Sequence, residues 1–178
     1  MRTFVAVEIH DEKVLDTIAK TQSDFKIKAT PVNKQNMHFT LLFLGEISEE
    51  AAENVKKEIS KISFHPIQVK FTHMGAFPNP RSPRVVWIGV DDEAAKKLIE
   101  LAIQVEKKLE PLGFRSDKSF RPHLTIFRIK NRVDLSHIID KFKDVDFGKD
   151  TITELKFKQS VLTPSGPIYS DLQVVLAQ

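Results

Sequence analysis

The chain has 178 residues, no cysteine, and a net charge of +3 from 27 basic and 24 acidic side chains. This length suits one domain, or two small lobes that share a core. The absence of cysteine excludes disulfides, thiolate catalysis and cysteine-bound zinc. No apolar run approaches the roughly 20 residues of a membrane span, and no signal peptide precedes the first strand pattern. We therefore expect a cytoplasmic protein with no membrane partner.

Predicted strands and helices alternate in the first half of the chain. Residues 3–9 form a strand pattern, and Asp11 is a suitable N-cap for the helix that follows. A second strand is predicted over residues 37–44. Ser48 then caps another helix, and residues 67–72 alternate apolar and polar side chains as a half-buried strand does.

The second half of the chain repeats this order. Residues 77–84 are rich in proline and cannot form a central strand. A strand over residues 85–90 leads to a long helix capped by Asp91 or Asp92. The remaining predicted elements are a basic loop (115–121), a strand (122–127), a helix around 135–142, and two closing strands (153–162 and 169–176).

Two of these strands carry the same short motif. His38 is followed two residues later by Thr40, and His123 is followed two residues later by Thr125. Side chains two residues apart in a strand point to the same face. Each motif therefore presents an imidazole and a hydroxyl together on a rigid strand.

The two motifs also indicate a duplicated unit. Both the histidines and the threonines are separated by 85 residues, and both halves read strand, helix, histidine strand, helix, strand. Self-similarity at one offset is typical of duplication, and we assign the copies to residues 3–74 and 85–162. A pseudo-twofold axis between them would place the two motifs opposite each other, with a phosphate near the axis.

Paired histidines and threonines suit phosphodiester hydrolysis without a metal. One group must take a proton from the attacking water and another must give a proton to the departing oxygen, and histidine can do either at neutral pH. The threonine hydroxyls can donate to the non-bridging oxygens. Arg121 lies two residues before His123 and so shares its face, whereas Arg128 turns away unless a bulge intervenes. Tyr169 follows a turn and either reaches a ligand or packs.

Each motif also has a less specific explanation. A single His-x-Thr in a strand is usually an ordinary residue pair, and the argument for function rests on two copies at matching places. A metal site would require a third or fourth ligand, and neither strand offers one beside its histidine. We therefore expect no metal and no cofactor.

These motifs resemble those of the 2'-5' RNA ligase family, whose members act as RNA 2',3'-cyclic phosphodiesterases within the two-histidine (2H) phosphoesterase superfamily. The segments that carry the resemblance are residues 38–45 (HFTLLFLG), 121–126 (RPHLTI) with Arg128, 2–6 (RTFVA) and 84–89 (RVVWIG). The resemblance covers essentially the whole chain, residues 1–178.

The resemblance implies an α+β fold, in which two pseudo-symmetric lobes of antiparallel sheet, with helices outside, enclose a central cleft. It also implies metal-free hydrolysis of RNA 2',3'-cyclic phosphate ends to 2'-phosphomonoesters. By analogy His38 is the proton donor to the leaving 3' oxygen, His123 is the proton acceptor that activates water, and Thr40 and Thr125 bind the phosphate. The residues themselves permit either assignment of acid and base.

The family name comes from a related reaction, in which an RNA 5'-hydroxyl replaces water and a 2'-5' linkage forms reversibly. The expected partner is RNA with 2',3'-cyclic phosphate ends, tRNA halves among them, and the expected state is a monomer. Arg121, Arg128 and Tyr169 are our candidates for substrate contacts.

Two other functions stay open from the sequence. In the first, the protein carries out the same chemistry on a small nucleotide, such as a cyclic phosphate of ADP-ribose or a 2'-5' oligoadenylate. Alternatively, the protein binds RNA ends and its catalysis is incidental, although the net charge of +3 speaks against tight binding of this kind.

Overall fold

The computed structural model describes residues 1–178, which form nine strands, four α-helices and two short 3₁₀ turns. The strands are β1 (Arg2–Glu8), β2 (Thr30–Pro31), β3 (His38–Glu46), β4 (Ile67–Phe77), β5 (Val85–Val90), β6 (Leu124–Arg128), β7 (Asp146–Ile152), β8 (Glu154–Thr163) and β9 (Gly166–Leu176). The helices are α1 (Glu12–Asp24), α2 (Glu49–Ile59), α3 (Asp92–Leu109) and α4 (Ser136–Asp140), with 3₁₀ turns η1 (Lys34–Asn36) and η2 (Glu110–Leu112).

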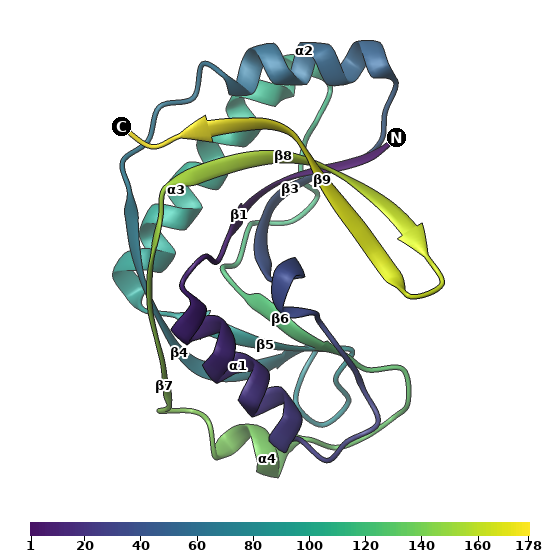
Figure 1. The fold of residues 1–178 in the computed structure, drawn as a ribbon, viewed down its shortest axis with the longest axis vertical. Helices are drawn as coiled ribbons and strands as arrows, with labels where there is room; N and C mark the ends of the chain where they lie inside the picture. Colours follow the sequence, from purple (N-terminus) through teal and green to yellow (C-terminus); the bar gives the residue numbers. More distant parts are fainter.

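The strands form two antiparallel sheets. The first sheet has the order β3-β1-β8-β9, and the second has the order β2-β6-β5-β4-β7. α3 packs against β3 of the first sheet and β4 of the second, α2 packs on α3 and β9, and α1 covers β6 and β7 (Figure 1). The expected α+β class, with two antiparallel sheets and helices outside them, is therefore confirmed.

Both sheets contain strands from each half of the chain. The first sheet joins β1 and β3 to β8, and the second inserts β4 between β5 and β7. The helices that follow β1 and β5 start at the predicted caps, because Asp11 and Asp91 accept hydrogen bonds from the backbone N–H groups of Val14 and Ala94. A single cluster of 41 buried hydrophobic residues runs through the molecule. The division into copies 3–74 and 85–162 stays a prediction.

The structure differs from the sequence expectation at β7 and at the second histidine strand. β7 was not predicted, since only Phe147 and Ile152 of its seven residues are buried and its solvent face is charged. The second histidine strand begins at Leu124 and ends at Arg128, so His123 lies immediately before it rather than inside it.

Candidate active site

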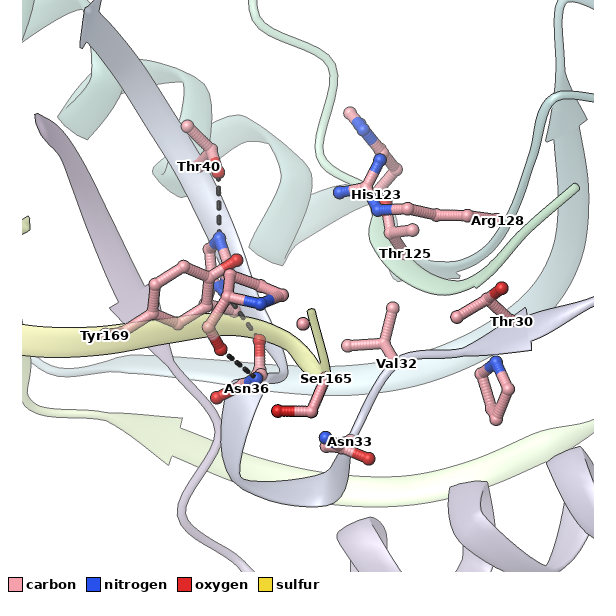
Figure 2. Close-up of a pocket in the computed structure, with 14 residues that line it drawn as sticks. Thr30, Val32, Asn33, Asn36, Thr40, His123, Thr125, Arg128, Ser165 and Tyr169 are labelled. Atoms are coloured by element: carbon pink, nitrogen blue, oxygen red, sulfur yellow. Dashed lines mark hydrogen bonds between the residues drawn. The ribbon is translucent and has the colours of Figure 1, made fainter. Parts of the chain in front are cut away.

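The structure brings both motifs to one cavity between the two sheets. β3 and β6 contact each other although they belong to different sheets. A cavity of about 150 Å³, which we call the histidine pocket, is lined by His38, Thr40, His123 and Thr125, with further residues that include Thr30, Asn33, Asn36, Arg128, Ser165 and Tyr169. Figure 2 shows His123, Thr125 and Arg128 on one side of this pocket and Thr40, Asn36 and Tyr169 on the other.

A β-bulge follows the threonine in both motif strands. In β3 the register with β1 passes from Thr40 to Leu42 and skips Leu41. In β6 the register with β5 passes from Thr125 to Phe127 and skips Ile126. An extra residue of this kind resets the alternation of faces.

The bulge in β6 decides the position of Arg128. Ile126 and Phe127 are both buried, at 0% and 3% exposure, and Arg128 returns to the face of Thr125. Its side chain lines the histidine pocket (Figure 2). From the sequence, Arg128 was expected to turn away from the face of His123 unless a bulge intervened. The structure contains this bulge.

Backbone carbonyls orient both imidazoles in the same way. The Nδ1 atom of His38 lies 2.7 Å from the carbonyl oxygen of Asn36, and the Nδ1 atom of His123 lies 2.5 Å from that of Arg121. Because a carbonyl oxygen can only accept, each Nδ1 carries the hydrogen. Each Nε2 is therefore the atom free to exchange a proton, and that of His38 lies 3.0 Å from Oγ1 of Thr40.

Aromatic side chains hold the two rings. The His38 ring lies 5.1 Å from Phe4 and 5.3 Å from Tyr169, while Phe4 and Tyr169 contact each other at 5.2 Å between centroids. The His123 ring lies edge-on to Phe77, at 4.9 Å. These ring contacts limit the rotation of each imidazole.

Burial lowers the pKa of both histidines. For His38, burial is the main cause; the hydrogen bond to Asn36 opposes it, and the positive charge of Lys158 adds to it. For His123, burial lowers the pKa against the hydrogen bond to Arg121. Burial also raises the pKa of Tyr169, so its phenol keeps its proton at neutral pH. Both imidazoles thus favour the neutral form until an anion binds beside them.

A partly buried group of charges lies beside His38 on the first sheet. The Lys158 ammonium contacts Glu8 and donates to Asp171 at 2.6 Å, and the Lys156 ammonium lies 2.8 Å from Glu8 and 3.0 Å from Asp171. Glu8 is the register partner of His38. We call these four residues the charge cluster. Sequence reasoning missed it, because it depends on the pairing of β1, β8 and β9.

Two predicted contact residues have different positions. Tyr169 lines the histidine pocket, carried there by the β8–β9 hairpin, whose Pro167 carbonyl accepts a hydrogen bond from Asn36. The Arg121 side chain does not line this pocket; it lies in a neighbouring groove, and its carbonyl bonds His123. Asn36 was missed, although it stands two residues before His38, as Arg121 does before His123.

No group of three or more His, Asp or Glu side chains is arranged to hold a metal ion. No helix is long and apolar enough to cross a membrane.

Comparison with known proteins decides the family. A family model described as LigT like phosphoesterase matches residues 7–87 and again residues 88–169. The chain belongs to this LigT-like phosphoesterase family. A protein of Archaeoglobus fulgidus named RNA 2',3'-cyclic phosphodiesterase is 44% identical over 178 residues, which cover 98% of this chain and 99% of that protein. A protein of the same name from Methanocaldococcus jannaschii is 40% identical over 95% of this chain and 96% of its own length.

Solved structures share the fold of this LigT-like chain. The crystal structure of TT0787 from Thermus thermophilus superposes with a TM-score of 0.81 at 27% identity, covering 99% of this chain and 97% of that one. E. coli LigT complexed with 3'-AMP superposes with a TM-score of 0.82 at 23% identity, covering 99% of this chain and 98% of its own. The likeness to LigT shows a common fold.

Proposed function

We propose that this protein is an RNA 2',3'-cyclic phosphodiesterase that converts cyclic phosphate ends to 2'-phosphomonoesters. One observation carries the proposal: two imidazoles, each with its Nδ1 bonded to a carbonyl and its Nε2 free to exchange a proton, share a pocket of about 150 Å³ with two threonines and an arginine. The names of the full-length relatives at 44% and 40% identity support the same substrate.

In the proposed step the water oxygen forms a bond to phosphorus while the bond between phosphorus and the 3' oxygen breaks. Nε2 of His123 accepts the proton that water loses, and protonated His38 donates its Nε2 hydrogen to the 3' oxygen. The products are a 2'-phosphomonoester and a free 3'-hydroxyl. Proton transfer alone balances this step, and the proposed mechanism uses no metal.

The remaining polar groups bind the phosphate. Thr125 and Arg128 lie on the His123 side of the pocket (Figure 2), where the hydroxyl and the guanidinium reach the non-bridging oxygens. Thr40 bonds Nε2 of His38, and we propose that it turns to the phosphate when substrate binds. Tyr169 contacts the edge of the terminal nucleotide beside His38.

The same residues support ligation when an RNA 5'-hydroxyl takes the place of water. His123 then accepts the proton of that hydroxyl, His38 again protonates the 3' oxygen, and a 2'-5' linkage forms. Reversal of both proton transfers cleaves the linkage. One chain supplies both histidines, which supports a monomeric enzyme. Its action on tRNA halves and its cytoplasmic location stay predictions.

The test is hydrolysis of an RNA oligonucleotide with a 2',3'-cyclic phosphate end, in the presence of a chelator. His38→Ala and His123→Ala are each expected to lower kcat by at least about 100-fold, the usual contribution of one positioned acid or base. Mapping the product should show the phosphate on the 2' oxygen. His137→Ala is the matched control, because His137 lies on α4 and lines neither the histidine pocket nor its neighbour.

Full activity in either active-site variant, with the fold confirmed by circular dichroism, would refute the two-histidine mechanism. Complete inhibition of the wild type by the chelator would refute the metal-free step. Tight RNA binding that survives both substitutions, together with no turnover by the wild type, would favour the RNA-end-binding protein.

A further inference from the structure

A second, larger cavity adjoins the histidine pocket. It measures about 900 Å³ and shares Thr40 and His123 with the pocket. We call it the side groove; its other walls come from β3, the ends of β4 and β5, and the loop that precedes β6. The histidine pocket, at about 150 Å³, is smaller than the roughly 300 Å³ at which ligand pockets usually begin. Any part of a substrate beyond the terminal ribose and phosphate therefore needs space outside that pocket.

The side groove is positively charged. Arg84, Lys118 and Arg121 line it, and no acidic residue does. None of these three cations forms an ion pair within the chain. Lys156 and Lys158, by contrast, are both paired with carboxylates in the charge cluster. Cations held next to a reacting phosphate without carboxylate partners favour an anionic occupant.

The groove also exposes aromatic rings. Phe43 is 51% exposed although it lies within a strand, and Phe77 and Phe120 line the same cavity. Phe43 stands 85 residues before Arg128, at the equivalent position after the bulge. One strand thus presents a guanidinium to the histidine pocket. The other presents to the side groove a half-exposed ring, with the Arg2 guanidinium 5.0 Å from its centroid. Neither core packing nor the proton transfers require this ring.

We infer that the side groove binds single-stranded RNA adjoining the reacting phosphate and selects oligonucleotide ends over single nucleotides. Exposed aromatic rings that stack on bases, together with cations along a groove, are the features by which proteins bind single strands without reading sequence. Thr40 and His123 lie where the pocket and the groove meet, so a strand in the groove leads directly into the histidine pocket. This inference rests on the proposed function, because it assumes that the reacting phosphate ends an RNA.

The main experiment compares kcat/KM for a six-nucleotide RNA with a 2',3'-cyclic phosphate end and for 2',3'-cyclic AMP. The wild type is expected to prefer the oligonucleotide. Phe43→Ala is expected to reduce that preference roughly 5- to 150-fold, the range that corresponds to stacking of one base. Phe43→Trp keeps a stacking surface and should restore the preference. Ile103→Ala, at a residue that is 47% exposed on α3 and lines neither cavity, should leave the preference unchanged.

A salt series tests the cations. The double variant Arg84→Ala/Lys118→Ala should flatten the dependence of log KM for the oligonucleotide on log salt by about 1.4, at roughly 0.7 for each phosphate that is no longer neutralised. Lys107→Ala/Lys108→Ala removes two charges from α3, away from both cavities, and should leave the slope as it is.

The RNA in the groove is either the strand that carries the cyclic phosphate or the 5'-hydroxyl strand of a ligation. A changed preference in hydrolysis assigns the groove to the first. A change confined to ligation, measured with a 5'-hydroxyl oligonucleotide, assigns it to the second. Equal use of the oligonucleotide and cyclic AMP by the wild type, with no effect of Phe43→Ala in either assay, would overturn the inference and leave the proposed function standing. Failure of the wild type to hydrolyse either substrate would instead refute the proposed function.

Discussion

Replacement of Lys158 by Met tests whether the charge cluster supports both the fold and the site. Lys158 is only 5% exposed, and its ammonium contacts Glu8 and Asp171. Met preserves most of the apolar stem and removes the charge. Glu8 and Asp171 would then share Lys156 alone, which leaves one negative charge uncompensated in a largely buried setting.

The expected loss of stability follows from these contacts. Removal of one partner from a buried ion pair costs about 3–5 kcal/mol, but the Asp171 side chain is 35% exposed and water screens part of its charge. We therefore expect the free energy of unfolding to fall by about 2–3 kcal/mol. For a chain of this length that corresponds to a decrease in Tm of about 4–12 °C.

Denaturant and thermal unfolding, both followed by circular dichroism, measure this loss. The double variant Glu8→Gln/Lys158→Met removes one charge of each sign and should recover part of the stability, which makes the two effects non-additive. Lys97→Met is the matched control: Lys97 is 47% exposed, and it lies 3.8 Å from Glu93 on the surface of α3. It should change the free energy of unfolding by less than about 0.5 kcal/mol.

A second measurement separates stability from catalysis. The charge of Lys158 is one of the causes that lower the pKa of His38. Its removal should raise that pKa and move the corresponding limb of the pH profile to higher pH. Wild-type stability of Lys158→Met, together with an unchanged pH profile, would refute the idea that the cluster supports the site.

Two further predictions concern the reaction itself. Because burial lowers the pKa of both histidines, and because kcat/KM reports the free enzyme, its bell-shaped pH profile should be centred below the usual histidine value of about 6.5. The bound phosphodiester anion favours protonated imidazole, so the pH profile of kcat should lie at higher pH than that of kcat/KM. Hydrolysis of cyclic AMP at a series of pH values measures both profiles. Coincident optima above pH 7 would contradict this reasoning. Arg128→Ala should lower kcat by about 100-fold, which is the usual effect of losing one hydrogen-bond donor to a developing charge. Arg128→Lys should recover only part of this loss, because lysine cannot bind two phosphate oxygens at once as the guanidinium fork does. An effect on KM alone would show that Arg128 binds substrate without stabilising the transition state.

The face that His38 and Thr40 share could be predicted from the sequence because it depends only on strand alternation. His38 and Thr40 are two residues apart, and the backbone geometry of a strand places them together whatever the sheet pairs with. The position of Arg128 was conditional on a bulge. Two adjacent apolar residues, Ile126 and Phe127, break the alternation and were a signal for it, as Leu41 and Leu42 are in the other motif strand.

Other parts of the site depend on pairings between distant segments. Lys158 lies opposite Phe4 in the register of β8 with β1, and Phe4 in turn contacts His38. No local pattern around residue 158 indicates this position. β7 was missed for a similar reason, since its pairing with β4 rather than its own sequence gives it strand geometry.

The two motif strands are alike in backbone geometry and unlike in what surrounds them. Each histidine bonds the carbonyl two residues before it, and each threonine precedes a bulge. His38, however, has Phe4, Tyr169 and the charge cluster as neighbours, whereas His123 packs on Phe77 at the mouth of the side groove.

Two identical imidazoles in identical surroundings would titrate alike, and neither would be fixed as acid or base. The distinction between them must therefore come from the neighbours that differ. Glu8 favours the protonated form of His38, and both Lys158 and Arg128 oppose it. The pKa shift of His123 comes instead from burial and from the hydrogen bond to Arg121. The charge cluster can thus adjust the proton affinity of one histidine without changing the other, which a symmetric pocket could not do.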